Sequence, residues 1–269
     1  MKPLIRTLVP ARRRNGPAAV VAAVAAVAVF AFLVQPAAAR AEGNHYTGHR
    51  IVPLPRERAA VRGLDVSSYQ GAVDWPAVAA AGAAFAYVKA TEGLTYRNEF
   101  FQQQYEGSAD AGLVRGAYHF ARPDSSGGAA QADAFLDGGG GWTADGRTLP
   151  GALDIEGVAA SDAPACYGLD QEGMVDWIRA FAERYRQRTG RHPVLYTNVT
   201  WWSQCTGGSR AFATTLPLWV ANHNGTAHPL PSGWTTYAVW QTADHGPFPG
   251  DQDVFNGSLR DLRAFAEGS

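Results

Sequence analysis

The stretch PGALDIE, residues 150–156, is a short apolar run that ends in two acids. Near-continuous apolar runs of this length are typical of strands buried on both faces of a parallel sheet. Similar runs recur along the chain: RGLDVSS (62–68), FAYVKA (85–90), VRGAYHF (114–120), HPVLYTN (192–198), PLWVANH (217–223) and YAVWQT (237–242). We therefore expect a sheet of many short strands, with PGALDIE as its fourth.

Helix-like segments lie between the earlier runs, at residues 74–82, 98–112, 129–138 and 171–190. Strands that alternate with helices predict right-handed βαβ units and a parallel sheet. After residue 191 the helical pattern fades and strand follows strand. This favours a barrel with a regular first half and a helix-poor second half over an open, doubly wound sheet.

The N-terminal segment predicts export. Basic residues precede a charge-free apolar stretch, residues 18–34, and small residues follow it, which is the pattern of a signal peptide. The alternative is an uncleaved membrane anchor, because the stretch is close to the shortest length that spans a bilayer. We expect a signal peptide over residues 1–41, a polar lead-in over 42–60 and a single catalytic barrel over 61–269, in a protein secreted to the extracellular space.

Charge and cysteine content narrow the function further. Residues 1–41 hold six of the 23 basic residues and no acid, so the mature chain has 17 basic against 24 acidic residues, a formal charge of −7. This argues against a nucleic-acid partner. Cys166 and Cys205 are the only cysteines, and in an exported chain we expect them to form a disulfide. The motifs of zinc proteases, serine hydrolases and P-loop enzymes are missing from the sequence.

Acids and aromatic residues gather at the ends of the expected strands, where the active sites of parallel α/β barrels lie. Asp154 and Glu156 are spaced so that both point to one face of their strand, with Ile155 turned toward the helices. Two carboxyl groups so close raise each other's pKa, so one stays protonated. A protonated acid beside a carboxylate can cleave a glycosidic bond. The alternative is a strand that merely ends in solvated acids.

A series of motifs in a fixed order resembles a known family, the glycoside hydrolase family 25 lysozymes, or Chalaropsis-type N-acetylmuramidases. The resemblance covers residues 62–265, and the segment 165–208, with both cysteines, is similar to the secreted actinobacterial branch. The motifs are GLDVSSYQG, AYVKATEG, RGAYHF, ALDIEG, VLYTN, LWVAN, VWQ and DVFNG.

The resemblance implies an irregular, TIM-like (β/α)5(β)3 barrel in one domain, which hydrolyses the β-1,4 bond between N-acetylmuramic acid and N-acetylglucosamine without a metal or cofactor. By position, Glu156 would be the general acid, Asp154 its partner, and Asp65 would lie across the cleft. The late acid of the family falls on Asp251, and relatives often have asparagine at the position of Asp253. The sequence leaves open which of these two faces the cleft.

The substrate suggests how the reaction proceeds. Its 2-acetamido group can attack the anomeric carbon itself, with Asp154 orienting that group and Glu156 acting first as acid and then as base. Net retention of configuration follows. The alternative is a direct nucleophile, Asp154 or Asp251, and a covalent intermediate.

Other side chains near strand ends are candidates for substrate binding, since aromatic rings can stack on sugars: Tyr118, Tyr196, Trp219, Asn222 and Trp240. Core packing is the alternative for the aromatic residues. We expect Lys89 to pair with Glu92, although it could also lower the pKa of Asp65, and we expect His119 to be a hydrogen-bonded barrel residue.

The predicted partner is the glycan strand of peptidoglycan, bound by a monomer without a stable protein partner. Two alternatives remain. A chitinase-like hydrolase also ends a barrel strand in DxE, but usually after further alternating aspartates. A cell-wall-binding module would have lost the activity, which the intact acids argue against.

Overall fold

The computed structural model describes residues 60–157 and 164–268. The expected signal peptide and nearly all of the lead-in lie outside the described residues. Within the described ranges, the helices are all too short or too polar to cross a membrane.

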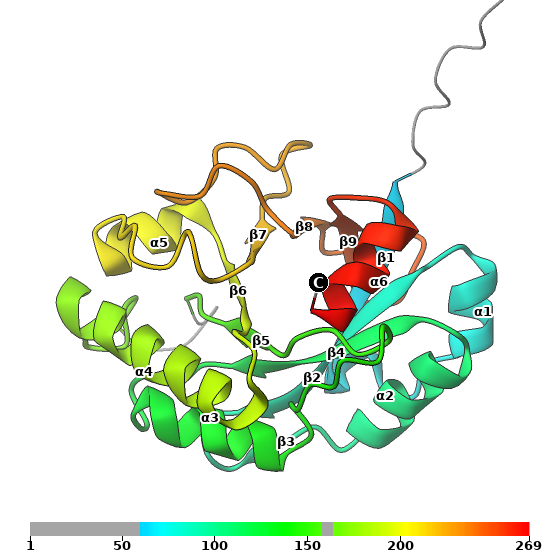
Figure 1. Cartoon of the computed structure of the whole chain (residues 1–269), viewed down its shortest axis with the longest axis horizontal. Helices are drawn as coiled ribbons and strands as arrows, with labels where there is room; N and C mark the ends of the chain where they lie inside the picture. The colour runs from blue at the N-terminus through cyan, green and yellow to red at the C-terminus, as the bar shows by residue number, and fades with distance from the viewer. Residues whose placement is uncertain (1–59, 158–163, 269) are drawn as a thin grey trace, which may run out of the picture. The chain divides into compact units, whose positions relative to one another are not determined.

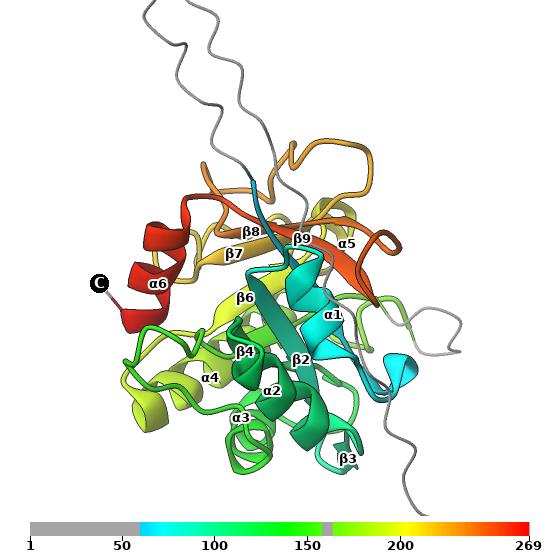
Figure 2. The same ribbon diagram turned by 90° about the vertical axis from the view of Figure 1, so that its right-hand side faces the viewer.

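The described residues form a closed barrel of eight strands (Figures 1 and 2). Around the barrel the order is β1, β2, β4, β5, β6, β7, β8 and β9, and β9 returns to pair with β1. A ninth, two-residue strand, β3 (Tyr96–Arg97), pairs only with β2. The barrel strands are β1 (Val61–Val66), β2 (Phe85–Glu92), β4 (Val114–Phe120), β5 (Ala152–Asp154), β6 (Val194–Thr197), β7 (Leu218–Ala221), β8 (Val239–Ala243) and β9 (Asp251–Phe255).

Strand direction explains how the first and last strands meet. Seven strands run parallel, from β1 round to β8, whereas β9 is antiparallel to both of its neighbours. The start of β9 therefore lies at the edge of the barrel where the other strands end. The register places Asp251, the first residue of β9, opposite Asp65 near the end of β1.

Helices follow the first five barrel strands, and three strands then complete the barrel, so the predicted (β/α)5(β)3 architecture is confirmed (Figure 1). Four helices match the segments expected from the sequence. The helices are α1 (Trp75–Ala80), α2 (Phe101–Asp110), α3 (Gly128–Asp137), α4 (Gln171–Thr189), α5 (Val199–Thr206) and α6 (Leu259–Glu267), with a short 3-10 helix η1 (Ser68–Gln70) after β1.

The last two helices correct the expectation that helices fade after residue 191. Asn198 caps α5 by accepting a hydrogen bond from the backbone of Trp201. A capping box formed by Ser258 and Asp261 starts α6. Both segments are short, and side-chain caps rather than a long apolar repeat define them. They cover the barrel without interrupting the run of strands β7, β8 and β9.

Two layers of apolar side chains build the domain. One fills the inside of the barrel, where the ring of Tyr87 stacks on Trp219 with centroids 4.7 Å apart. Gly116 makes this possible, because a Cβ there would collide with Tyr87. The other layer lies between the strands and helices and includes Ile155, which confirms its predicted outward direction. Because side chains fill the inside of the barrel, a ligand can bind only at its open edge.

Candidate active site

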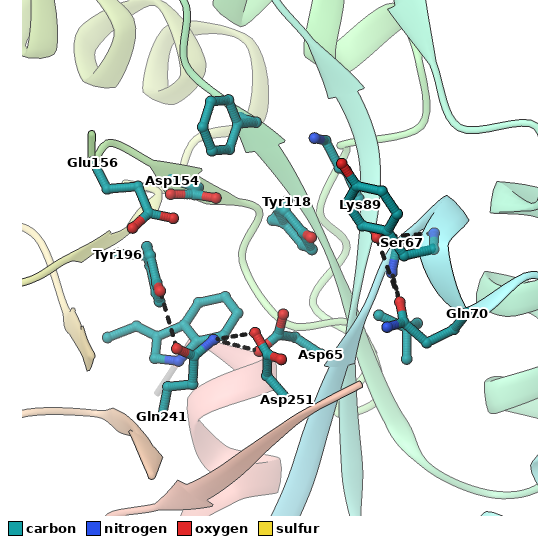
Figure 3. A pocket seen from close by; sticks show the side chains of 14 residues that line it. Asp65, Ser67, Gln70, Lys89, Tyr118, Asp154, Glu156, Tyr196, Gln241 and Asp251 are labelled. Atoms are coloured by element: carbon teal, nitrogen blue, oxygen red, sulfur yellow. Dashed lines mark hydrogen bonds between the residues drawn. The ribbon is translucent and has the colours of Figure 1, made fainter. Parts of the chain in front are cut away.

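A pocket of about 200 Å³ opens at the carboxyl ends of the parallel strands (Figure 3). The barrel strands and the turn after β1 all contribute to it. Its lining residues are Asp65, Val66, Ser67, Tyr69, Gln70, Lys89, Tyr118, Phe120, Asp154, Glu156, Tyr196, Trp219, Gln241 and Asp251. The four acids predicted as catalytic thus lie in one pocket.

Asp154 and Glu156 form one side of this pocket, and Figure 3 shows their carboxyl groups next to each other. Asp154 is the last residue of β5 and is buried, whereas Glu156 lies two residues beyond the strand and is half-buried. Neither carboxyl group accepts a recorded hydrogen bond from another described residue, and Oδ1 of Asp154 is buried without a partner. Both groups therefore have free acceptor positions for a substrate.

The backbone of Glu156 is held from behind by Tyr167, whose hydroxyl donates to the Glu156 carbonyl oxygen at 2.7 Å. Tyr167 has a φ of 56°, a left-handed conformation that costs energy for a bulky side chain. Its neighbour Cys166 is bonded to Cys205 in α5, as the sequence predicted. Trp201 also donates to the Ala165 carbonyl oxygen at 3.0 Å. Helix α5 thus anchors the segment that supports Glu156.

Asp65 and Asp251 face Asp154 and Glu156 across the pocket, and Gln241 of β8 connects them (Figure 3). The Gln241 amide nitrogen donates to Oδ2 of Asp65 at 2.8 Å and to Oδ2 of Asp251 at 3.0 Å. Its amide oxygen accepts from the Tyr196 hydroxyl at 3.0 Å and from Nε2 of His223 at 3.1 Å. An ionised carboxylate can only accept, so the amide nitrogen of Gln241 faces these acids when either of them is charged.

Asp253 lies below the pocket rather than in it. Its side chain is only 2 % exposed, and Oδ1 accepts a hydrogen bond from the Trp219 indole at 2.9 Å. Asp251 is one of the lining residues and Asp253 is not. Of the two positions that the sequence left open, Asp251 is therefore the one that faces the cleft.

Burial and the charges of neighbouring acids raise the pKa values of both carboxyl groups at the end of β5. Loss of water raises the pKa of Glu156 to about 7, and the charge of Asp251 adds to this. Burial, followed by the charge of Glu156, raises the pKa of Asp154 well above its ordinary value. One proton shared by this pair near neutral pH leaves an acid beside a carboxylate.

The opposite acids are shifted in the same direction. Burial and the charge of Asp251 raise the pKa of Asp65 to about 8, although the Gln241 amide opposes the shift. Burial also raises the pKa of Asp251 and, more strongly, that of Asp253. The pocket therefore gathers carboxyl groups that cannot all be ionised at once.

Lys89 pairs with Glu92 at 2.7 Å, which confirms the expected ion pair. Its ammonium group also lies over the ring of Phe120, at 4.7 Å from the centroid. The sequence allowed that Lys89 lowers the pKa of Asp65. Instead, its charge lowers the pKa values of Asp154 and Glu156 against the effect of burial.

His119 is a hydrogen-bonded barrel residue, as expected. Its Nδ1 lies 2.6 Å from the Thr91 hydroxyl, and its Nε2 lies 2.9 Å from the amide oxygen of Gln131. Burial lowers the pKa of His119 to about 4. A neutral, fully enclosed imidazole of this kind supports the fold and does not reach the pocket.

Three of the predicted substrate-binding residues, Tyr118, Tyr196 and Trp219, form the floor of the pocket. Asn222 lies in a neighbouring pocket. Trp240 lines neither of these pockets: its ring packs against the layer between strands and helices, and its indole donates to the Asn222 carbonyl oxygen at 2.8 Å. Side chains alternate along β8, so Gln241 points into the barrel and its neighbour points out.

The sequence-based selection missed Gln241 and the turn after β1. In that turn, Ser67 caps η1 and the Gln70 side chain accepts from the Ser67 backbone at 2.8 Å, while Tyr69 stands 94 % exposed at the rim of the pocket. The motif SSYQ and the position of Gln241 at a strand end were the available signals.

No three histidine, cysteine, aspartate or glutamate side chains in residues 60–157 and 164–268 are grouped so that they could hold a metal ion.

Comparisons with known proteins agree with this geometry. The model of the family Glycosyl hydrolases family 25 matches residues 64–251, a span that holds all four acids of the pocket. The chain belongs to glycosyl hydrolase family 25. As a member of that family it is a glycoside hydrolase, and the family suggested by the sequence motifs is confirmed.

Proteins similar to this chain are named as muramidases or lysozymes. The family 25 chain is 47 % identical to an N,O-diacetylmuramidase of Chalaropsis sp. over 77 % of its own length and all of the relative's. It is 45 % identical to Lysozyme M1 of Streptomyces globisporus, over 79 % of this chain and 73 % of that one. A solved muramidase from Trichobolus zukalii superimposes with a TM-score of 0.75, at 48 % identity over 78 % of this chain and all of the other.

Proposed function

We propose that this family 25 hydrolase is a secreted lysozyme. It cleaves the β-1,4 bond between N-acetylmuramic acid and N-acetylglucosamine in peptidoglycan, with Glu156 as the general acid. The observation that carries the proposal is the pair at the end of β5, where Glu156 has a pKa raised to about 7 beside the buried Asp154. The muramidases and the lysozyme to which the chain is similar support the substrate.

Glu156 suits the role of acid and base because a catalytic pKa near the working pH allows a group to give and take a proton. It protonates the oxygen of the leaving sugar and then removes a proton from the attacking water. The Tyr167 hydroxyl, which binds its backbone carbonyl, limits the freedom of this residue at the end of the strand.

Asp154 binds and polarises the 2-acetamido group of the muramic acid. The oxygen Oδ1 of Asp154 is buried and lacks a partner in the described structure, so an amide N–H of the substrate would satisfy it. That hydrogen bond favours the charged form of Asp154 and transfers the shared proton to Glu156. The acetamide oxygen can then attack the anomeric carbon, which gives net retention.

Asp65 and Asp251 stabilise the positive charge that develops on the sugar ring. Gln241 fixes both carboxyl groups from below, so they need no rearrangement during the reaction. The floor formed by Tyr118, Tyr196 and Trp219 supports the sugar ring from the side of the barrel interior.

The test is digestion of purified peptidoglycan by the secreted form and by a Glu156→Gln variant, with mass spectrometry after borohydride reduction. Reduced muramic acid at the new ends, formed by the wild type and lost in Glu156→Gln, supports a muramidase. Reduced glucosamine ends would indicate a glucosaminidase instead. Glu99→Gln, an exposed acid that does not line the pocket, is the matched control.

Stereochemistry tests the reaction route. NMR of the first products should show the β anomer, as retention requires. An α anomer would exclude the acetamide route and the direct nucleophile alike. A trapped covalent glycosyl-enzyme on Asp154 or Asp251 would exclude the acetamide route alone.

A further inference from the structure

Asp253 is a buried acid that the proposed mechanism does not use. It is the third residue of β9, and its side chain is only 2 % exposed. Asp251, two residues earlier on the same face of the strand, pairs with Asp65 of β1. Asp253 therefore lies diagonally opposite Asp65 and one step deeper in the barrel. Three carboxyl groups are thus gathered where the last strand closes against the first.

We propose that Asp253 stays protonated and acts as a positioning residue, which donates a hydrogen bond to Asp65 and accepts one from Trp219. For its effect on the reaction rate the inference rests on the proposed function, because Asp65 and Trp219 both line the acidic pocket. Asp253 does not line that pocket. It therefore acts on the reaction only through these two neighbours.

The two oxygens of Asp253 have different surroundings. Oδ1 accepts a hydrogen bond from the Trp219 indole at 2.9 Å, as the carbonyl oxygen of a neutral acid can. Oδ2 is buried and accepts no hydrogen bond in the described structure. A buried, charged oxygen without a donor is costly, whereas a hydroxyl at the same place can donate. Asp65 offers the acceptor, because the two carboxyl groups lie within hydrogen-bonding reach of each other.

The groups around Asp253 favour its neutral form. Burial raises the pKa of Asp253, and the charges of Asp65 and Asp251 raise it further. Tyr87 of β2 also interacts with Asp253, but its hydroxyl donates its one proton to the Pro150 carbonyl oxygen at 3.0 Å. Among the residues that the structure describes, no ion pair includes Asp253. A negative charge on Asp253 would thus lack a cation to balance it.

A protonated Asp253 gives Asp65 a second hydrogen-bond donor. The Gln241 amide donates to Oδ2 of Asp65 at 2.8 Å, and the Asp253 hydroxyl supplies the other bond. Both bonds favour the charged form of Asp65 and lower its pKa against the effect of burial. A carboxylate held by two donors can stabilise the positive charge that develops on the sugar without first having to move. The bond to Trp219 holds the floor of the pocket in the same way.

A carbon-13 NMR titration of the aspartate carboxyl groups tests the protonation of Asp253 without any substrate. The signals of Asp253 and Asp65 are assigned by their loss in Asp253→Asn and Asp65→Asn. We expect Asp253 to remain protonated until Asp65 has titrated.

Variants at position 253 make the sign of the effect decisive. Asp253→Asn should leave the pKa of Asp65 at about 8, because an amide also donates and is also neutral. Asp253→Leu should raise this pKa, because the donor is lost. If Asp253 were charged, both variants would remove a negative neighbour and lower the pKa of Asp65. An Asp253 that ionises before Asp65, or a pKa of Asp65 that does not rise in Asp253→Leu, would overturn the inference.

Kinetics on peptidoglycan separate this role from support of the fold alone. Asp253→Leu loses the bonds to Asp65 and Trp219, so kcat should fall by about 10- to 100-fold with KM little changed. Asp253→Asn can form both bonds and should restore kcat to within about 3-fold of the wild type. Asp110→Asn, an exposed acid outside the pocket, is the matched control. Equal losses of kcat in the two variants at position 253, or no loss in Asp253→Leu, contradict the inference.

Two further outcomes keep the inference separate from folding and from the proposed function. If Asp253→Leu does not fold, the titration of the wild type and of Asp253→Asn still decides whether Asp253 is protonated. A wild type that releases no reducing ends contradicts the proposed function, whereas the titration needs no substrate and still decides the inference.

Discussion

The two sides of the acidic pocket use the same functional group in different ways. Asp154 and Glu156, at the end of β5, accept no recorded hydrogen bond on their carboxyl groups from described residues, and one oxygen is buried without a partner. Asp65 and Asp251, on β1 and β9, both accept from the single amide of Gln241. The carboxyl groups at the end of β5 therefore have free acceptor positions and form the open side of the pocket. Those on β1 and β9 already accept hydrogen bonds and form the bonded side.

This difference suggests a division of labour. A carboxyl group that must exchange a proton or bind a substrate amide needs a free lone pair, and it is sensitive to each new neighbour. A carboxyl group that only stabilises charge works best when it is fixed in advance. Carboxyl groups whose pKa values are all raised can therefore have different roles, and their hydrogen-bond partners distinguish them.

The largest expected effect on kcat comes from removing the charge of Asp154, on the open side of the pocket. Asp154→Asn should reduce kcat on peptidoglycan by about 10²- to 10⁴-fold, since it disables the group that works with the acid. Asp65→Asn should cost less than about 100-fold, because an amide can still bond to Gln241. Steady-state rates of reducing-end release measure both. Equal losses in the two variants would mean that the two sides do not differ in role.

Removing the Gln241 amide, which bridges Asp65 and Asp251, tests whether holding these two carboxyl groups in place contributes to the rate. Gln241→Leu should lower kcat/KM by about 10- to 100-fold, as two hydrogen bonds to charged groups are lost. The pKa values of Asp65 and Asp251 should rise further, because the amide protons that favour their charged forms are gone. Carbon-13 NMR titration of the aspartate carboxyl groups measures this shift. An unchanged titration would show that Gln241 has no influence on these acids.

A smaller effect is expected from the support behind Glu156. Tyr167→Phe removes only the hydroxyl that holds the Glu156 carbonyl oxygen, so kcat should fall by about 3- to 10-fold with KM unchanged. Tyr237→Phe removes the hydroxyl of a partly buried tyrosine that does not line the pocket, and it serves as a control for kcat. A decrease in thermal stability without any decrease in kcat would show that Tyr167 only supports the fold.

The pH dependence of stability should distinguish Glu156 on the open side from Asp65 on the bonded side, because their pKa values differ. Both Glu156 and Asp65 have folded pKa values above their ordinary ones, so each contributes stability at low pH that is lost as pH rises through the folded pKa. The loss due to Glu156 should be complete slightly above pH 7 and that due to Asp65 slightly above pH 8. Calorimetry between pH 4 and 9 should therefore show a falling Tm. The slope near pH 8 should flatten in Asp65→Asn and persist in Glu156→Gln.

The strands and the acids of the pocket could be predicted from the sequence because they depend on local patterns. Apolar runs mark the buried strands, and the spacing of Asp154 and Glu156 sets their common direction whether or not the strand continues to residue 156. The family motifs then placed Asp65 and Asp251 in the same cleft. Their meeting in the structure agrees with that placement.

What the sequence did not predict depends on contacts between distant segments. The choice between Trp240 and Gln241 depends on which of the two neighbouring residues points inward. Ala238, Val239 and Trp240 are all apolar, so the run YAVWQT shows no alternation that decides it. Helix α5 has only eight residues, so its apolar residues form no clear helical repeat in the sequence. Its cap and the disulfide hold it in place instead. The role of Tyr167 depends on its own left-handed backbone conformation, which no pattern of side chains in the sequence predicts.

The antiparallel closing strand also has a consequence for synthesis of the protein. Asp65 and Asp251 belong to the first and last strands of the barrel, and they meet only when β9 inserts between β8 and β1. Nearly the whole domain must leave the ribosome before that can happen, and such distant pairings form slowly. A nascent chain therefore lacks the complete set of acids until almost the whole barrel has been synthesised, and a shorter fragment of the barrel cannot form the pocket.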